Sequence, residues 1–150
     1  MASIAPALES RYGSNGITGR RALVLGAGGV AKTIAYGLVK QGANVVICSR
    51  TQERSEVLAG QLHCDFVDWE SRHNVEADLV VNGTPVGMHP NVDQTPLEKR
   101  GLRREMVVFD TIYNPEQTLL VKLARESGCE VVTGVDMFVR QAALQFEGIT

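Results

Sequence analysis

The 150-residue sequence has little of several residue types, and each scarcity excludes a class of protein. Aromatic residues make up 5% of the chain, too few for the stacking platforms with which proteins bind single-stranded nucleic acid. The formal net charge of −2 provides no general attraction to nucleic acid or to an anionic membrane surface. We therefore expect no nucleic-acid partner and no membrane partner.

Cysteine is also scarce, and its spacing matches no known framework. The three cysteines, at positions 48, 64 and 129, are odd in number and form no C-x-x-C pair, which excludes a disulfide framework and a zinc site. His63, His73 and His89 lack the spacing of metal ligands, and we interpret them as surface residues. We expect no metal, and we expect a reducing cytosol as the compartment, or a plastid if the source is a plant.

Long apolar runs are missing as well. Nowhere are there 18 consecutive apolar residues, and residues 1–9 lack the basic region and apolar core of a signal peptide. The sequence therefore predicts a soluble chain without a targeting segment. Its length suits one domain, which we place at residues 20–150. Residues 1–19 are interpreted as a lead-in segment, either a linker or a short helix near Leu8.

The most informative segment that is present is residues 22–33. An apolar run at residues 22–25 leads into Gly26-Ala27-Gly28-Gly29, after which Val30, Ile34 and Leu38 recur at helical spacing. This order predicts a strand, a tight turn and a helix. Glycines in such a turn let a pyrophosphate approach the backbone, and the small Ala31 allows the helix to pack on the strand. A plain glycine-rich loop is the alternative, but a second strand follows at βαβ distance.

Strands and helices alternate through the rest of the sequence. Strands are predicted at residues 44–49, 66–68, 78–82, 106–109 and 130–133, and helices at residues 29–41, from Thr51, 116–127 and 135–146. We expect Val57, Leu58 and Leu62 to form the inner face of one helix, and Leu119, Leu120 and Leu123 that of another. The fold class predicted is α/β, a Rossmann-like doubly wound parallel sheet with six strands in the order 3-2-1-4-5-6 and helices on both faces.

The residues after the second predicted strand indicate which dinucleotide would bind. An NAD-binding domain usually places an acidic residue there, but no Asp or Glu occurs from position 10 to position 52. Ser49, Arg50 and Thr51 occupy that place, and Arg54 follows one helical turn later. Two guanidinium groups and two hydroxyls beside a helix N-terminus suit the 2′-phosphate of NADP. The alternative is that both arginines form an exposed basic edge of the helix.

Five segments in this order resemble the NADP-binding domain of shikimate dehydrogenases, and they look closest to the plant-like bifunctional dehydroquinate dehydratase/shikimate dehydrogenase group. They are residues 26–31 (GAGGVA), 49–54 (SRTQER), 82–88 (NGTPVGM), 109–115 (FDTIYNP) and 134–142 (GVDMFVRQA). The resemblance covers about residues 20 to 147. It implies NADP as cofactor and the NADPH-dependent reduction of 3-dehydroshikimate to shikimate, on the route to chorismate and the aromatic amino acids.

The resemblance also implies a role for each matching residue. The pyrophosphate would be held by Gly26, Ala27, Gly28, Gly29, Val30 and Ala31, and the adenosine phosphate by Ser49, Arg50, Thr51 and Arg54. Thr84, Pro85 and Val86 would line the ribose and nicotinamide side, and Ile112, Gly134, Met137 and Phe138 would surround the nicotinamide. Tyr113 and Gln141 would reach the substrate.

Blander interpretations exist for several of these residues. Tyr113 could simply cover the carboxyl edge of the sheet, although ligands of open α/β sheets bind at that edge. Gln141 could face solvent on a largely apolar helix, and Met137 and Phe138 would be assigned to the core on spacing alone.

The family's catalytic lysine and aspartate belong to an N-terminal substrate domain, and residues 1–19 are too few to form it. We therefore expect this chain to bind the cofactor without significant turnover. Two alternatives remain open. The chain could belong to a quinate dehydrogenase, which differs mainly in its substrate domain. It could instead be a nucleotide-sensing or interaction module whose closing helix docks on a partner.

Overall fold

The computed structural model describes residues 16–134, which form a parallel sheet covered on both faces. Six strands pair in the order β3-β2-β1-β4-β5-β6, so the predicted fold class and strand order are confirmed. The strands are β1 (Arg21–Leu25), β2 (Asn44–Cys48), β3 (Asp65–Phe66), β4 (Leu79–Asn82), β5 (Val107–Asp110) and β6 (Glu130–Thr133). The helices are α2 (Gly29–Lys40), α3 (Gln52–Leu62) and α4 (Leu119–Glu126), with 3-10 turns η1 (Trp69–Asn74) and η2 (Lys99–Gly101).

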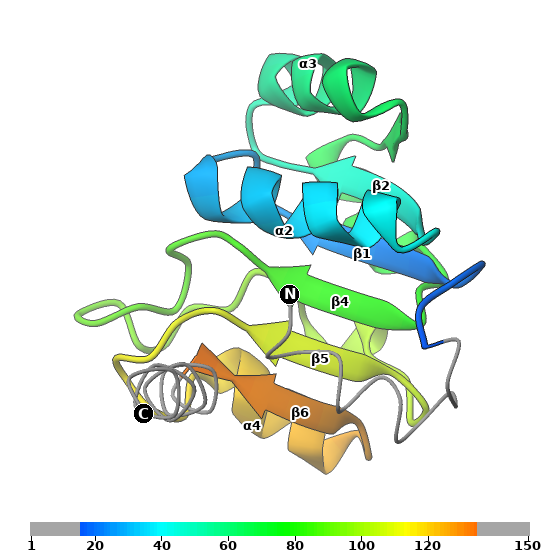
Figure 1. Ribbon diagram of the computed structural model, residues 1–150. Helices are drawn as coiled ribbons and strands as arrows, with labels where there is room; N and C mark the ends of the chain where they lie inside the picture. The colour runs from blue at the N-terminus through cyan, green and yellow to red at the C-terminus, as the bar shows by residue number, and fades with distance from the viewer. Residues whose placement is uncertain (1–15, 135–150) are drawn as a thin grey trace, which may run out of the picture.

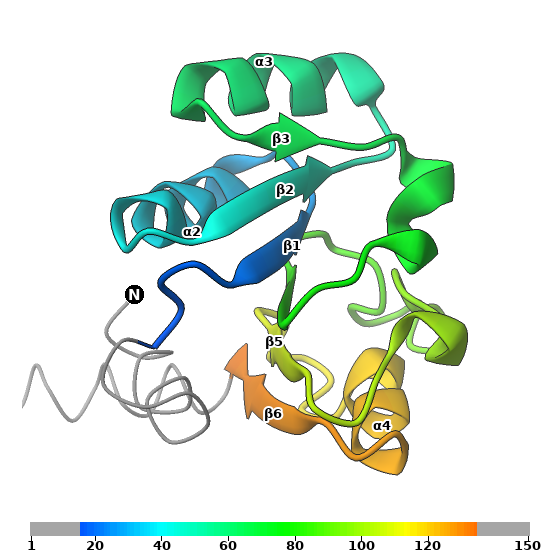
Figure 2. The same cartoon turned by 90° about the vertical axis from the view of Figure 1, so that its right-hand side faces the viewer.

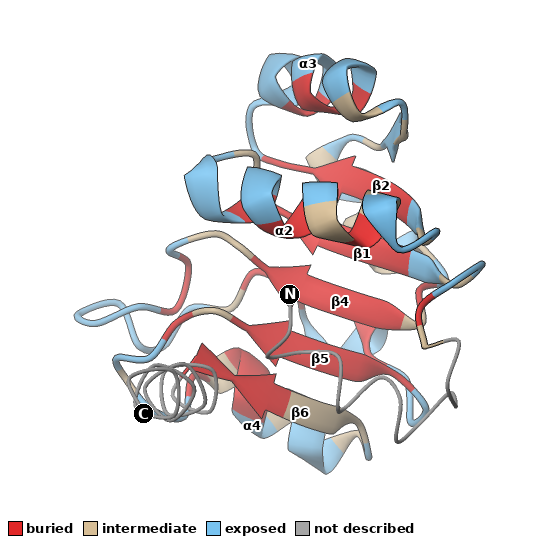
Figure 3. Ribbon diagram, viewed as in Figure 1, coloured by how far each residue is buried: buried red, intermediate tan, exposed pale blue. Residues whose placement is uncertain are grey.

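The sheet separates two apolar layers. Helices α2 and α3 cover one face, and α4 with the two 3-10 turns covers the other (Figures 1 and 2). Because successive side chains of a strand point to opposite faces, Val24 and Ile47 contribute to the first layer, whereas Leu25 and Cys48 contribute to the second. Strands β1, β2, β4 and β5 are buried along most of their length, the edge strand β3 is exposed, and so are the outer surfaces of the helices (Figure 3). Such strands are typical of a parallel sheet.

The carboxyl ends of the strands lie together at one edge. Leu25 is in register with Cys48 of β2 on one side and with Asn82 of β4 on the other. Asn82 is in turn in register with Asp110 of β5, and Asp110 with Thr133 of β6. All the turns that carry the predicted cofactor residues leave the sheet at this edge, which is where ligands bind in open α/β folds.

Several predicted boundaries and faces need correction. Strand β3 is only Asp65–Phe66, β2 ends at Cys48, and β5 extends to Asp110. Helix α4 begins at Leu119 because the Thr118 side chain caps it, accepting the Val121 N–H. The buried face of α4 consists of Leu120, Val121 and Ala124, so the prediction of Leu119 was wrong.

Helix α3 buries Ser55, Leu58 and Ala59, and the predicted core residue Val57 is 61% exposed. Val30 at the start of α2 is 52% exposed, and Ala31 takes the inner position instead. The buried position of Ala31 in α2 agrees with the prediction that this small residue packs on the strand, whereas in α3 the small Ser55 and Ala59 are buried and Val57, which was expected there, is not. The close approach of each helix to the strands selects the smaller side chain.

The predicted closing helix at residues 135–146 lies outside the described residues, as does most of the lead-in segment at residues 1–19. Met137, Phe138 and Gln141 therefore have no structural description. Within residues 16–134, no helix is long and apolar enough to cross a membrane.

Candidate dinucleotide site at the carboxyl edge of the sheet

The glycine turn after β1 joins three strand ends. The Gly26 N–H donates to the Cys48 carbonyl at 2.7 Å, and the Gly83 N–H donates to the Leu25 carbonyl at 2.8 Å. Gly26 has a φ of +106°, and a Cβ there would lie 3.1 Å from the Gly83 carbonyl carbon. The turn therefore requires glycine at this position for both its conformation and its packing.

The two following glycines face open space. A Cβ added to Gly28 or Gly29 would meet no atom within 4 Å, so the backbone of the turn is accessible to a ligand. Gly28 is the N-cap of α2, no side chain among the described residues bonds to that cap, and the first turn carries no acidic residue. The positive end of the helix dipole and its first amide groups therefore remain available for an anion. These features fit a pyrophosphate.

Ala31 explains why the third position of the turn must be small. It is fully buried, and a Cβ on Gly83 would approach the Ala31 Cβ to 2.9 Å. Helix α2 thus packs directly on the backbone that follows β4. A larger side chain at either position would force the helix away from the sheet.

The residues after β2 divide into a buried and an exposed group. Ser49 is buried, and its hydroxyl lies 2.7 Å from the Thr51 carbonyl oxygen and 2.7 Å from the Ser55 hydroxyl. Arg50, Thr51 and Arg54 are exposed. Thr51 occupies the N-cap position of α3, as predicted, but its side chain makes no capping hydrogen bond. In this conformation Ser49 shapes the turn, while the other three residues present donors to solvent.

A hollow of about 370 Å³ lies between α2 and α3, beside the glycine turn. Ala27 of the turn and Arg54 of α3 both line it, together with Lys32, Glu53, Val57, Leu58 and Gln61. The hollow therefore connects the predicted pyrophosphate site with one of the two predicted 2′-phosphate ligands. Lys32 adds a second cationic group that the sequence analysis had not assigned to the site.

Two buried polar residues organise the other half of the edge. Asn82 and Asp110 are both fully buried, and the Asn82 Nδ2 donates to Asp110 Oδ1 at 3.2 Å. The Thr118 hydroxyl donates to Asp110 Oδ2 at 2.6 Å, and the Ile112 N–H donates to Oδ1 at 3.0 Å. Burial raises the pKa of the Asp110 carboxyl, and these three hydrogen bonds oppose that increase.

The same asparagine holds the loop after β4. Asn82 Oδ1 accepts from the Thr84 N–H at 2.9 Å and from the Thr84 hydroxyl at 2.6 Å, and the Val86 N–H donates to Thr84 Oγ1 at 3.2 Å. The His89 N–H donates to the Asn114 carbonyl at 3.0 Å, which ties this loop to the one after β5. Thr84, Pro85 and Val86 therefore follow the glycine turn along the edge. Pro85 is exposed and Val86 is buried.

The loop after β5 places the predicted nicotinamide and substrate residues. Ile112 is buried, and Tyr113 is 71% exposed. Gly134 lies against this loop, because a Cβ there would come 2.6 Å from the Thr111 carbonyl oxygen and 2.9 Å from that of Ile112. The structure thus brings Ile112 and Gly134 together and leaves the Tyr113 side chain open to solvent.

Sequence reasoning missed three residues of this edge. Asn82 and Asp110 were included in the matched segments without a role, although a polar residue ending a buried strand is a recognisable signal. Trp69 was not considered at all. It begins η1, and its ring lies 5.6 Å from the guanidinium carbon of Arg50 and 4.0 Å from that of Arg72.

All three histidines were predicted to be exposed surface residues, and this is wrong for His73. His63 and His89 are exposed, but His73 is partly buried, and its Nε2 accepts the Glu98 N–H at 2.9 Å. Burial and the nearby Arg72 and Arg100 lower the pKa of His73. Among residues 16–134 there is no cluster of three or more side chains that could hold a metal ion.

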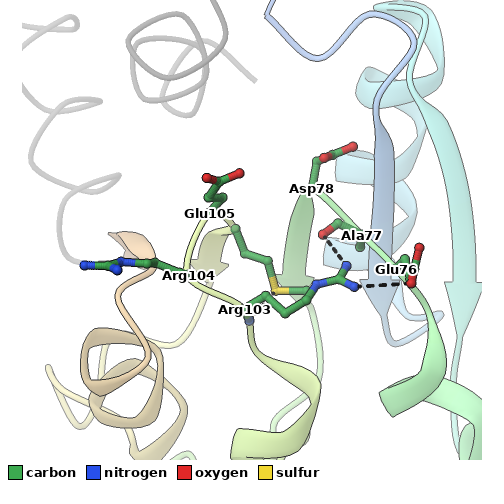
Figure 4. Close-up of a pocket in the computed structure, with 7 residues that line it drawn as sticks. Glu76, Ala77, Asp78, Arg103, Arg104 and Glu105 are labelled. Carbon is green, nitrogen blue, oxygen red and sulfur yellow. Dashed lines mark hydrogen bonds and ion pairs between the residues drawn. The ribbon is translucent and has the colours of Figure 1, made fainter.

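A larger hollow of about 490 Å³ lies at the opposite, amino-terminal edge of the sheet (Figure 4). The Arg103 side chain reaches across it, with Nη1 3.7 Å from Glu76 and Nη2 donating to the Ala77 carbonyl at 3.4 Å. Three acidic residues (Glu76, Asp78 and Glu105) and two basic residues (Arg103 and Arg104) line it, which provides no net attraction for a phosphate. Neither the glycine turn nor the two exposed arginines line this hollow.

Comparison with known proteins shows what the whole chain is similar to. Residues 21–115 match the family model described as NADP oxidoreductase, coenzyme F420-dependent. A bifunctional 3-dehydroquinate dehydratase/shikimate dehydrogenase of Arabidopsis thaliana, described as chloroplastic, is 41% identical over 140 residues, which cover 91% of this chain and 23% of that protein. The chain spans about half the length of the other curated relatives it matches, which are named shikimate dehydrogenase (NADP(+)).

Two solved structures illustrate the likeness in three dimensions. A shikimate dehydrogenase in complex with NADP+ superposes with a TM-score of 0.81 at 32% identity, over 97% of this chain and 53% of that chain. A quinate dehydrogenase from Corynebacterium glutamicum in complex with NAD superposes with a TM-score of 0.78 at 30% identity, over 94% of this chain and 52% of that chain. The resemblance drawn from the five sequence segments is confirmed.

Proposed function

Because the chain belongs to the family described as NADP oxidoreductase, coenzyme F420-dependent, we propose that it is the NADP(H)-binding part of a shikimate dehydrogenase. In the complete enzyme, hydride would pass between NADPH and 3-dehydroshikimate to form shikimate, on the route to chorismate. The dinucleotide supplies the hydride. The protein must bind the dinucleotide, orient it and hold the substrate carbonyl beside it.

The observation that carries this proposal is the combination of an open glycine turn with exposed arginines on the next strand end. Gly28 and Gly29 leave room for the pyrophosphate in front of the uncapped helix α2. Arg50 and Arg54 stand beside it at the start of α3, where an acidic residue would reject a 2′-phosphate. Guanidinium groups bind phosphate with paired donors, so this end of the site favours NADP over NAD.

The other proposed contacts follow the same edge. Thr84, Pro85 and Val86 would line the ribose side, and Ile112 with Gly134 would border the nicotinamide. Tyr113 is our candidate for a substrate contact because its side chain is 71% exposed at the edge where ligands bind. Gln141, Met137 and Phe138 keep their proposed roles, although they lie outside the described residues.

We also propose that residues 20–150 act as the cofactor domain and that another domain supplies the catalytic lysine and aspartate. The limited share of each relative that the chain spans supports this division. The expected compartment is the cytosol, or a plastid in a plant. An assay of this chain alone with NADP and shikimate should give no significant turnover, and an appreciable rate would contradict the proposed division.

Charge reversal tests the cofactor assignment directly. Charge-assisted hydrogen bonds are each worth about 1.5 to 3 kcal/mol, so R50E and R54E should each weaken NADP binding at least about tenfold. The affinity for NAD, which lacks the 2′-phosphate, should change less than about twofold. Isothermal titration calorimetry with both dinucleotides measures these affinities.

The matched control is R125E, which reverses an exposed arginine on α4, across the sheet from α3 (Figure 2). It should leave both affinities unchanged. Equal losses for NADP and NAD in R50E and R54E would refute the 2′-phosphate assignment.

A quinate dehydrogenase is the second candidate, because a quinate dehydrogenase with bound NAD superposes almost as well as the NADP complex. The two candidates differ in the preferred dinucleotide and in substrate. Stronger binding of NAD than of NADP by this chain, together with faster turnover of quinate by the full-length protein, would favour the second.

A further inference from the structure

Trp69 lies within cation–π distance of two arginines, Arg50 and Arg72. It is the only tryptophan in the sequence and the first residue of η1. The side chain is partly buried and packs against the apolar layer on the α4 face of the sheet. Its ring is therefore anchored on one side by the core and can serve as a fixed surface for a neighbouring cation.

Arg72 packs closely against that ring. Its Nε donates to the Pro96 carbonyl at 2.7 Å, and its Nη1 donates to the Trp69 carbonyl at 2.8 Å. With two of its N–H donors held by backbone oxygens, the guanidinium carbon lies 4.0 Å from the ring centroid. Arg72 is thus committed to a structural role, and it holds the indole in place.

Arg50 has the opposite character. Its guanidinium carbon lies 5.6 Å from the same ring centroid, within the range of a cation–π interaction. Arg50 is exposed, and within residues 16–134 its guanidinium makes no hydrogen bond or ion pair. All its donors remain available to a ligand, while the indole limits where the group can go.

We propose that Trp69 is a positioning residue that holds the Arg50 guanidinium beside the end of β2, ready for the 2′-phosphate of NADP. The inference rests on the proposed cofactor. An arginine that is already confined loses less side-chain freedom when it binds, so support by the indole strengthens NADP binding and not NAD binding. Selectivity for NADP over NAD therefore depends on Trp69, which packs on the α4 face of the sheet and need not contact either dinucleotide.

Two variants of Trp69 in the full chain test this role. W69L removes the π surface and should weaken NADP binding about two- to fivefold, the range expected for an exposed cation–π contact. W69F keeps an aromatic ring and should recover most of the loss. The affinity for NAD should stay constant in both variants, as measured by isothermal titration calorimetry.

The matched control is Y36L. Lys40 Nζ lies 5.4 Å from the ring centroid of Tyr36 on the exposed side of α2, so this variant removes a similar contact away from the site. It should alter neither affinity. Thermal unfolding of each variant separates lost binding from lost folding.

The single tryptophan also provides a spectroscopic readout that a purely structural role would not produce. Titration of the wild-type chain with NADP should change the emission of Trp69, because the bound phosphate compensates the charge of the Arg50 guanidinium while that group stays beside the ring. In R50Q the change should disappear even at NADP concentrations that saturate the variant. This measurement remains informative if W69L fails to fold.

Equal weakening of NADP and NAD by W69L, no recovery in W69F, or an undiminished emission change in saturated R50Q would each overturn the inference. In those cases NADP binding by the wild type would still support the proposed cofactor. Failure of the wild-type chain to prefer NADP would instead refute the cofactor assignment, and the positioning role with it.

Discussion

The buried carboxylate of Asp110 should be essential to the carboxyl edge of the sheet. It accepts three hydrogen bonds, from the Asn82 side chain, the Thr118 hydroxyl and the Ile112 N–H. D110A would leave these donors without their acceptor in a region where Asn82 is fully buried and Thr118 is 1% exposed. Each unsatisfied buried donor costs about 1 to 3 kcal/mol.

The hydroxyl of Thr118 can rotate, so we count the two N–H donors in full. Two unsatisfied donors at about 1 to 3 kcal/mol each give an expected loss for D110A of about 2 to 6 kcal/mol. D110N is the matched variant, because its amide has the same shape. Its oxygen can still accept from Asn82 and Ile112, and its NH2 group can donate to Thr118 Oγ1. It also removes a buried charge, so its cost should be below about 2 kcal/mol.

Urea denaturation at neutral pH, followed by circular dichroism, measures both free energies of unfolding. If D110A loses no more stability than D110N, the unsatisfied N–H donors are not the cause of the loss. The binding of NADP should follow the same order, because Asn82 also positions the Thr84 loop through two hydrogen bonds. Wild-type affinity in a folded D110A variant would show that the network does not shape the site.

Two further variants probe packing and pH. G83A should destabilise the chain by about 1 to 3 kcal/mol in urea, since its Cβ would lie 2.9 Å from the Ala31 Cβ. The control G60A, in open space on α3, should instead stabilise it by up to about 1 kcal/mol, and equal effects would contradict the packing argument. Burial, Arg72 and Arg100 hold the pKa of His73 below its ordinary 6.5, so its contribution to stability is complete above pH 6.5 and is lost as the pH falls through the lowered folded value. H73Q should therefore flatten the fall in the urea midpoint between about pH 7 and about pH 5, and an unchanged fall would exclude this histidine as its cause.

Local sequence determined the centre of the fold. The strand, glycine turn and helix of residues 21–40 could be predicted because their signals are contiguous: an apolar run, glycines with a required conformation, and a helical repeat. The strand order followed from the regular alternation of strands and helices. The absence of an acidic residue near Arg50 is likewise visible in the chain itself. The role proposed for Gln141 came only from resemblance to a family, whereas that of Tyr113 also rested on its place at the carboxyl edge of the sheet.

Only the tertiary structure decided which side chains meet across that frame. Val57 is exposed and Val121 is buried although both are valines, because the orientation of each helix against the sheet decides which of its faces is covered. Asn82 and Asp110 are 28 positions apart and become partners through the register of β4 with β5. Arg50 follows β2 and Trp69 begins η1, and the two side chains come close only after the chain has passed through α3 and β3. The local sequence determines the glycine turn, because its signals are contiguous. The side chains around the turn come from distant parts of the chain, so only tertiary packing decides which of them meet.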